Sequence, residues 1–285
     1  MHKIHNLFIA VSLLIPQGIF SQNDTLLVTE KTTLKQTVWQ NLKYDGLSAF
    51  GGVKYTYSRP FHWEERDFIR LTGFVASEVI LYSLDTNLDS YFSGQGENVP
   101  DWLVRSGWYL GKPQYNYAII GSIYTFGLLT KNEKIRRTGV LMISSATAAG
   151  LLQTTFKTVA GRARPGAGLG KHDFDMFSNK ASHHSFPSGH TILSFTLAHA
   201  LAKQFDNLWI KSGIYAIGSI TPLSRMWERA HWATDVFAGM MIGIISVESV
   251  DKYLNTSNRY EGSQKDRISW RFTMGVGTVG VTGIF

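Results

Sequence analysis

The 285-residue chain contains no cysteine, which excludes a disulfide framework and a thiol nucleophile. It also lacks a basic run with interleaved aromatic residues, so we predict no nucleic-acid partner. The mean hydropathy of −0.06 is low for a chain made mostly of transmembrane helices. What the chain does have is an excess of positive charge, with a formal net charge of +7 and a pI of about 9.5. Such an excess favours anionic partners such as lipid head groups.

The N-terminus has the organisation of an export signal. Lys3 precedes an apolar run over residues 7–15, and the small residue Ser21 follows as a plausible cleavage site. The run is too short to span a bilayer. We therefore predict that residues 1–21 are a signal peptide and that the protein is exported. The alternative is an N-terminal anchor that is not removed.

Three short stretches in the second half of the chain carry residue types suited to phosphoryl transfer. They are Lys157 with Arg164-Pro165, then Pro187-Ser188-Gly189-His190, and then Ser224-Arg225 with His231 and Asp235. A phosphoryl group in transit spreads its charge over three oxygens, so its transfer needs fixed cations and hydrogen-bond donors. Lys157, Arg164 and Arg225 supply three cations, and the two arginines add planar forks suited to paired oxygens.

The second and third stretches add donors and a histidine pair. Ser188 offers a hydroxyl, and the N–H of Gly189 can approach an anion closely because glycine has no Cβ. These residues form a turn that opens a helix near His190, where the helix dipole favours negative charge. His231 and Asp235 are four residues apart and share a face if they lie on a helix. The carboxylate would then hold one imidazole nitrogen and leave the other to attack phosphorus.

In this order and at these spacings, the three stretches resemble the signature of the type 2 phosphatidic acid phosphatase and vanadium haloperoxidase superfamily. The motif region, residues 157–235, covers about a quarter of the chain. The resemblance implies that His231 is the nucleophile, that Asp235 orients it and that His190 is the general acid. It also implies a phosphate cradle and no metal or other cofactor. The cradle residues would be Lys157, Arg164, Ser188, Gly189 and Arg225.

We therefore expect a phosphoric monoester hydrolase that acts on monoesters or pyrophosphates through a phosphohistidine. Candidate substrates are phosphatidate-like lipids, undecaprenyl pyrophosphate and lipid A phosphates. The alternatives are a soluble, non-specific periplasmic acid phosphatase, a vanadium-dependent haloperoxidase, and a binding protein whose site is a relic. The short chain and its apolar helices argue against the peroxidase. The intact motifs argue against the relic.

The hydrophobic pattern predicts an all-α fold, a bundle of about six core helices with short strand-like tails at both ends. The helices are expected over residues 67–84, 114–131, 137–157, 189–204, 211–223 and 233–253. Residues 87–112 are predicted to be a loop or a broken amphipathic piece, and 161–186 a long functional loop. Alternation at 53–57 and 268–276 predicts strands, which we expect to pair in one small sheet. The domain division is 22–66, a polar segment; 67–253, the helical phosphatase domain; and 254–285, the tail.

Two segments, 113–130 and 138–156, hold 18 and 19 residues without a charge, enough to span a bilayer. Four cations lie between them, at positions 131, 134, 136 and 137, which indicates a cytoplasmic loop. The second span would then carry Lys157 to the periplasmic side. Three crossings would leave Lys157 inside, so the charged 67–84 segment is expected to lie on the membrane surface or on the bundle. We thus expect a membrane-associated envelope protein, with a soluble periplasmic bundle as the alternative.

Overall fold

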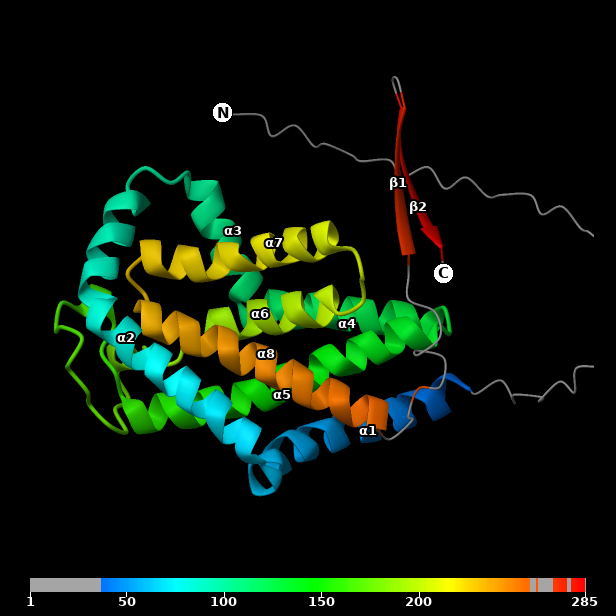
Figure 1. Ribbon diagram of the computed structural model, residues 1–285, viewed down its shortest axis with the longest axis horizontal. Coiled ribbons are helices and arrows are strands. Elements are labelled where there is room, and N and C mark those ends of the chain that lie inside the picture. The colour runs from blue at the N-terminus through cyan, green and yellow to red at the C-terminus, as the bar shows by residue number, and fades with distance from the viewer. Residues whose placement is uncertain (1–36, 257–259, 261–268, 276–277, 285) are drawn as a thin grey trace, which may run out of the picture. The chain divides into compact units, whose positions relative to one another are not determined.

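A computed structural model describes residues 37–256, 260, 269–275 and 278–284 of the chain (Figure 1). The predicted signal peptide lies outside the described residues. The described part contains long helices and a C-terminal hairpin, which confirms the all-α class. The helices are α1 (Val38–Ser58), α2 (Glu65–Gly96), α3 (Asp101–Gly111), α4 (Pro113–Leu129), α5 (Glu133–Ala160), α6 (Gly189–Ala202), α7 (Leu208–Trp227) and α8 (Ala233–Thr256), with short 3₁₀ turns η1 (Arg59–His62), η2 (Pro165–Ala167) and η3 (Ala181–His183).

Helix α5 is central to the bundle and contacts α1, α4, α6 and α8. Helix α7 packs on α6 from the other side and is covered by α3. The core is formed where these helices meet, by buried side chains such as Ile120, Leu141, Met142 and Val247. Helices α5 and α7 end at the same end of the bundle at which α6 and α8 begin, on the left in Figure 1. This end gathers the termini of four helices, and all three sequence motifs lie there.

The strand predicted over residues 53–57 is wrong, because these residues belong to α1. The helix begins with a capping box, in which the Thr37 hydroxyl accepts from the N–H of Gln40 and the Gln40 side chain accepts from the N–H of Thr37. Its inward face is made of small and polar residues such as Asp45 and Ser48, while Trp39 is 71% exposed. A prediction that places apolar residues in the core fails for a helix whose outer face is apolar.

The loop predicted over residues 87–112 is also wrong, because α2 continues to Gly96 and α3 follows at once. The glycines that indicated a break are contact positions. A Cβ on Gly107 would lie 2.6 Å from the carbonyl oxygen of Ile220, and one on Gly96 would lie 3.0 Å from that of Trp227. Both contacts are with α7, so the glycines allow close helix packing and do not end the helices.

The C-terminal strand prediction is confirmed, but its partner differs from the one we expected. Strands β1 (Ser269–Gly275) and β2 (Thr278–Ile284) form an antiparallel hairpin, in which Phe272 is opposite Val281. The described strands of the tail therefore pair with each other, and the N-terminal segment that was expected to join them is helical.

Two of the described helices, α5 and α8, are long and apolar enough to cross a membrane. Helix α5 contains the predicted 138–156 span. Helix α4 has 17 residues, which places it at the short end of the range for a membrane-crossing helix. Helix α2 packs against α7 and α8, in agreement with the expectation that the 67–84 segment lies on the bundle.

Candidate active site

The eight residues predicted from the motifs lie at helix ends or in the connections at one end of the bundle. Lys157 is in the last turn of α5, Arg164 lies in the connection after it, and Arg225 is in the last turn of α7. Ser188 is the N-cap of α6, Gly189 and His190 are its first two residues, His231 precedes α8, and Asp235 is in the first turn of α8.

The connection after α5 is set by a glycine that no other residue can easily replace. Gly161 ends α5 with φ +54°, in the left-handed region, and a Cβ there would lie 1.9 Å from the carbonyl oxygen of Asp175. The chain then turns back across the end of the helix. The N–H of Arg164 donates to the carbonyl oxygen of Ser182 at 2.8 Å, and the ammonium of Lys157 donates to that of His184 at 2.6 Å. These contacts fix the first motif against the segment that leads into the second.

The second motif is fixed against the third through the backbone of Ser188. Its N–H donates to the carbonyl oxygen of Asp235 at 2.9 Å, and its hydroxyl oxygen accepts from Thr191 Oγ1 at 2.9 Å. The hydroxyl proton of Ser188 is thus left to donate elsewhere. Gly189 lies against Gln153 of α5, where a Cβ would come within 2.5 Å of the amide nitrogen. A side chain at this position would fit only if the amide of Gln153 moved away.

Asp235 is fully buried and is held by several donors. Its Oδ2 accepts from the N–H of Trp232 at 2.8 Å and from the hydroxyl of Ser185, and its Oδ1 accepts from Arg162 at 2.8 Å. The Nδ1 of His231 lies 3.7 Å from Oδ2, which is within ion-pair range but longer than a hydrogen bond. The two side chains therefore lie next to each other, as expected, but do not form a hydrogen bond. Catalytic hydrogen bonds in unliganded sites are often long and shorten when substrate binds.

Sequence reasoning missed the residues that hold Asp235. Arg162 donates from Nη1 to Asp235 and from Nη2 to Asp85 of α2, the latter at 2.7 Å. The hydroxyl of Thr234 donates to Asp85 Oδ2 at 2.6 Å and accepts from Arg162 at 2.6 Å. The result is a buried chain of charges that runs from α2 to the neighbour of His231. Arg162 stands two residues before Arg164, but Asp85 has no spacing pattern to reveal it.

Three nitrogens of the eight motif residues are buried and have no hydrogen-bond partner within the described residues. They are Nε of Arg164, Nε2 of His190 and Nδ1 of His231. A buried polar atom without a partner is costly, so such atoms mark a place where a ligand is expected. Arg225 differs, because its guanidinium contacts Glu228 and the hydroxyl of Ser224. An anion bound between Arg164 and His190 would satisfy two of these nitrogens, whereas Nδ1 of His231 faces Asp235.

Burial, assisted by the cations of the site, sets the protonation of its histidines. Burial, followed by the charge of Arg225, lowers the pKa of His190 to about 3. Burial also lowers the pKa of His231 to about 4, although the adjacent carboxylate of Asp235 favours the charged form. Both imidazoles are therefore neutral at pH 7. A neutral imidazole has a lone pair available for attack on phosphorus.

Residues 138–258 match the profile of the PAP2 superfamily. The match covers less than half of the chain, and it marks a PAP2-like domain. The matched region begins within α5 and ends after α8, so it contains all three motifs. Asp85, on α2, contacts the PAP2 domain from outside the matched region. Within the described residues, no group of three or more His, Asp or Glu side chains is placed to hold a metal ion.

Curated relatives of the PAP2 domain include two enzymes of Porphyromonas gingivalis. A lipid A 4′-phosphatase is 24% identical over 188 residues, which cover 64% of this chain and 79% of the relative. A lipid A 1-phosphatase is 32% identical over 79 residues, which cover 27% of this chain and 18% of the relative. The match thus spans most of one relative and less than a fifth of the other. A PAP2-type phosphatidylglycerolphosphate phosphatase from Bacillus subtilis has a TM-score of 0.49 at 19% identity, covering 65% of this chain and 96% of that one.

Proposed function

We propose that the protein is a phosphatase that removes a terminal phosphate from a phosphorylated membrane lipid through a phosphohistidine on His231. The observation that carries the proposal is the convergence of the three motifs on one end of the bundle, where Arg164 and His190 each have an unpartnered buried nitrogen and Nδ1 of His231 faces Asp235. Cations and donors arranged in advance around an empty position are what a phosphoryl transition state requires.

In the first step, His231 attacks the phosphorus atom and forms a P–N bond while the bond from phosphorus to the leaving oxygen breaks. Because His190 is neutral in the free site, it takes up the proton that the monoanionic substrate carries and delivers it to that oxygen, and the alcohol or the lipid phosphate departs. The cradle of Lys157, Arg164 and Arg225 stabilises the charge on the transferring group. In the second step, water attacks the phosphohistidine, His190 accepts its proton, and inorganic phosphate leaves. His190 then releases that proton to the phosphate or to solvent, so the second step restores both histidines.

A lipid substrate is supported by the character of the surface and by the relatives. The printed names of both Porphyromonas relatives identify lipid A phosphatases. Helices α5 and α8 are long and apolar enough to cross a bilayer. Large apolar side chains are exposed around the bundle, among them Val79 and Ile80 on α2 and Phe126 and Leu129 on α4. Apolar exposure of this extent indicates a lipid environment. We propose that the site faces the periplasm.

The test is phosphate release by the purified protein across a panel of lipid and soluble esters, with chelator present. We expect turnover by the wild type, and no turnover and no acid-labile phosphoenzyme in His231→Ala after rapid quench. A labelled phosphoenzyme in that variant would place the nucleophile elsewhere. Bromide oxidation with added vanadate, in the absence of phosphate release, would instead identify a haloperoxidase.

A further inference from the structure

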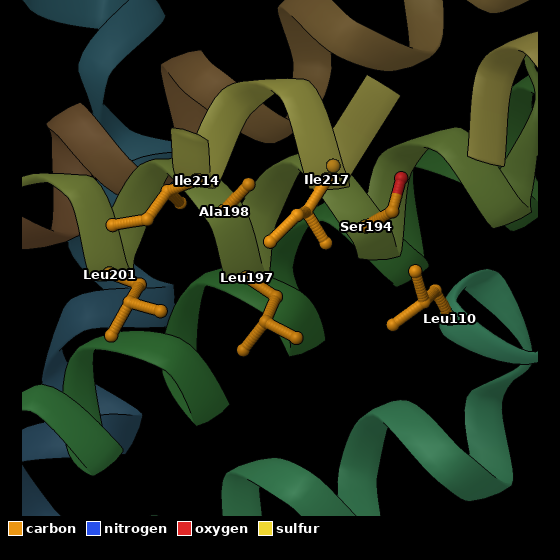
Figure 2. Close-up of a pocket in the computed structure, with 8 residues that line it drawn as sticks. Leu110, Ser194, Leu197, Ala198, Leu201, Ile214 and Ile217 are labelled. Atoms are coloured by element: carbon orange, nitrogen blue, oxygen red, sulfur yellow. The ribbon is translucent and has the colours of Figure 1, made fainter. Parts of the chain in front are cut away.

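An apolar groove runs along α6 between α3 and α7 (Figure 2). It encloses about 100 Å³, and leucine and isoleucine side chains from the three helices line it, among them Leu197, Leu201, Ile214 and Ile217. The only polar side chain in the lining is that of Ser194, and its hydroxyl donates to the carbonyl oxygen of Thr191 at 3.2 Å. The groove therefore offers no free hydrogen-bond donor and no charge to an occupant.

The groove lies on the same face of α6 as His190. Positions 190, 194, 197 and 201 follow one another at intervals of four, three and four residues, which places them on one stripe of a helix. Ser194, the first of them to line the groove, is one turn beyond His190. With a rise of 1.5 Å per residue, Leu201 lies about 16 Å along the axis from His190. The groove thus leads away from the site along α6.

The C-terminal end of α3 joins the groove to the site. Leu110 lines the groove, and its neighbour Gly111 packs on His190, where an added Cβ would lie 2.6 Å from the His190 Cβ. One turn earlier, the ring of Trp108 stacks on the His190 ring with centroids 6.3 Å apart. Because His190 is the proposed proton donor, the leaving oxygen must come next to it. The part of the substrate attached to that oxygen then extends from this corner.

We propose that the groove binds the hydrocarbon chain that adjoins the leaving oxygen of the lipid substrate. The inference rests on the proposed phosphatase function and adds where the apolar part of the substrate lies. A sugar or another polar group would lose its hydrogen bonds with water in this groove, since the lining offers none in return. The floor is shallow, because α6 and α7 approach so closely that a Cβ on Gly218 would lie 2.8 Å from that of Ala198. A linear chain suits such a space.

The test is a series of straight-chain alkyl phosphates of increasing length, with the protein in phosphatidylcholine nanodiscs. Each methylene that enters an apolar site contributes about 0.8 kcal/mol, so kcat/KM should rise by up to about fourfold per carbon until the groove is full. Partition of the longer esters into the bilayer also contributes to this slope. That contribution is the same for every variant of the protein, so slopes are compared between variants.

The informative substitution is Ile217→Asn, with Ile245→Asn on α8 as its matched control. Both isoleucines are exposed, by 58% and 56%, so neither change creates a cavity in the core. We expect Ile217→Asn to lower kcat/KM for dodecyl phosphate at least about fivefold relative to the control, and to leave ethyl phosphate within about twofold. A loss of the same size for both esters, or equal slopes in the two variants, would overturn the inference.

A second measurement locates the hydrocarbon chain of the substrate directly. An alkyl phosphate with a photoreactive diazirine at the end of a dodecyl chain should label α6 or α7 near Leu201 and Ile214. Labelling confined to α2 or α8 would place the hydrocarbon chain of the substrate elsewhere.

If the wild type releases phosphate from every ester at one rate, the proposal that the groove binds the hydrocarbon chain is refuted, but the proposed function is not. A wild type that releases none from any ester refutes the proposed function as well.

Discussion

Arg162 and Asp235 form an ion pair of 2.8 Å that is almost completely removed from solvent. The same guanidinium reaches Asp85 at 2.7 Å, so one arginine joins α2 to the carboxylate beside His231. Buried charges of this kind are stable only when each is paired and hydrogen-bonded. The arrangement fixes the position of Asp235, and Asp235 in turn faces the imidazole of His231.

We therefore expect Arg162→Lys to lower kcat by about 100-fold with little change in KM, because Arg162 positions the nucleophile pair and does not contact the substrate. A lysine keeps the charge but cannot donate in two directions from a planar fork. Asp85→Asn should have a smaller effect of the same kind. Both constants are measured by phosphate release.

The control for this prediction is Arg136→Lys. Arg136 forms an equally buried pair with Asp45 at 2.8 Å, in α5 and α1 and away from the motifs. The Arg136→Lys substitution should reduce thermal stability and leave kcat of the folded protein unchanged. If both arginine variants alter kcat and stability to the same degree, the role of Arg162 is structural only.

The site was predictable from the sequence where its chemistry imposes spacing. Positions such as Arg164, His190 and His231 lie in short segments with fixed offsets, and the structure brings those segments together. Asp85 was not predictable, because a residue on α2 meets Arg162 only through the packing of α2 on the bundle. The periodicity of a single sequence does not show which distant segments contact each other.

The helices from α4 onward were predictable to within a few residues, because each contains a stretch of apolar and small residues with few charges. Helices α1 and α3 were not. In α1 the buried face carries Asp45 and Ser48 while Trp39 faces outward. The usual assumption that apolar residues face the core fails for such a helix. In α3, Gly107 allows close contact with another helix, but a glycine in a sequence is commonly taken to indicate a loop.

The role of His190 predicts how its loss depends on the leaving group. If His190 protonates the leaving oxygen, His190→Ala should matter least for an ester whose alcohol is already a good leaving group. We expect a loss of kcat of roughly 100-fold or more on an alkyl phosphate and of tenfold or less on p-nitrophenyl phosphate. Equal losses on the two esters would contradict the role.

Vanadate tests the phosphate cradle because it imitates the five-coordinate transition state and should inhibit tightly and competitively. Arg164→Lys should weaken this inhibition although the charge is kept, because the fork of the guanidinium is lost. Arg225→Lys should also weaken the inhibition. We expect the inhibition constant of vanadate to rise about tenfold or more in each variant. Lys211→Arg, near the opposite end of α7, is the control. An unchanged constant in both cradle variants would show that neither arginine touches the bound oxyanion.

The depressed pKa values of the two histidines predict an acidic pH optimum. His231, with a pKa of about 4, is neutral and able to attack at any pH above that value. His190, with a pKa of about 3, is also neutral in the free site, so the proton it delivers must arrive with the substrate. The monoanion of a phosphate ester carries that proton and loses it near pH 6.

We therefore expect kcat/KM to be level between pH 5 and about 6 and to fall about tenfold per pH unit above it. A fluorinated alkyl phosphate with a lower second pKa should move the falling limb to lower pH by the same amount. A limb that stays in place when the substrate pKa changes would assign it to an enzyme group. A rate that rises toward pH 8 would be incompatible with proton delivery by the substrate.

The last prediction concerns the orientation in the membrane, which was inferred from the cations between segments 113–130 and 138–156. Two of the four cations that indicated a cytoplasmic loop, Arg136 and Arg137, are buried and paired with Asp45 and Asp251. Lys131 and Lys134 also lie between the two segments, so the predicted orientation keeps the same sign.

Because the chain has no cysteine, single cysteines can report the topology without background. Thr130→Cys, before α5, and Asn179→Cys, beside the site, are exposed and leave the charges intact. We expect an impermeant maleimide to label Asn179→Cys in spheroplasts, and Thr130→Cys only after permeabilisation. The reverse pattern would place the site in the cytoplasm. Labelling of both, with the protein in the osmotic-shock fraction, would show a soluble periplasmic phosphatase. The assignment of His231 would survive that result because it depends on the motifs, but the bilayer would no longer deliver the substrate to the α6 groove.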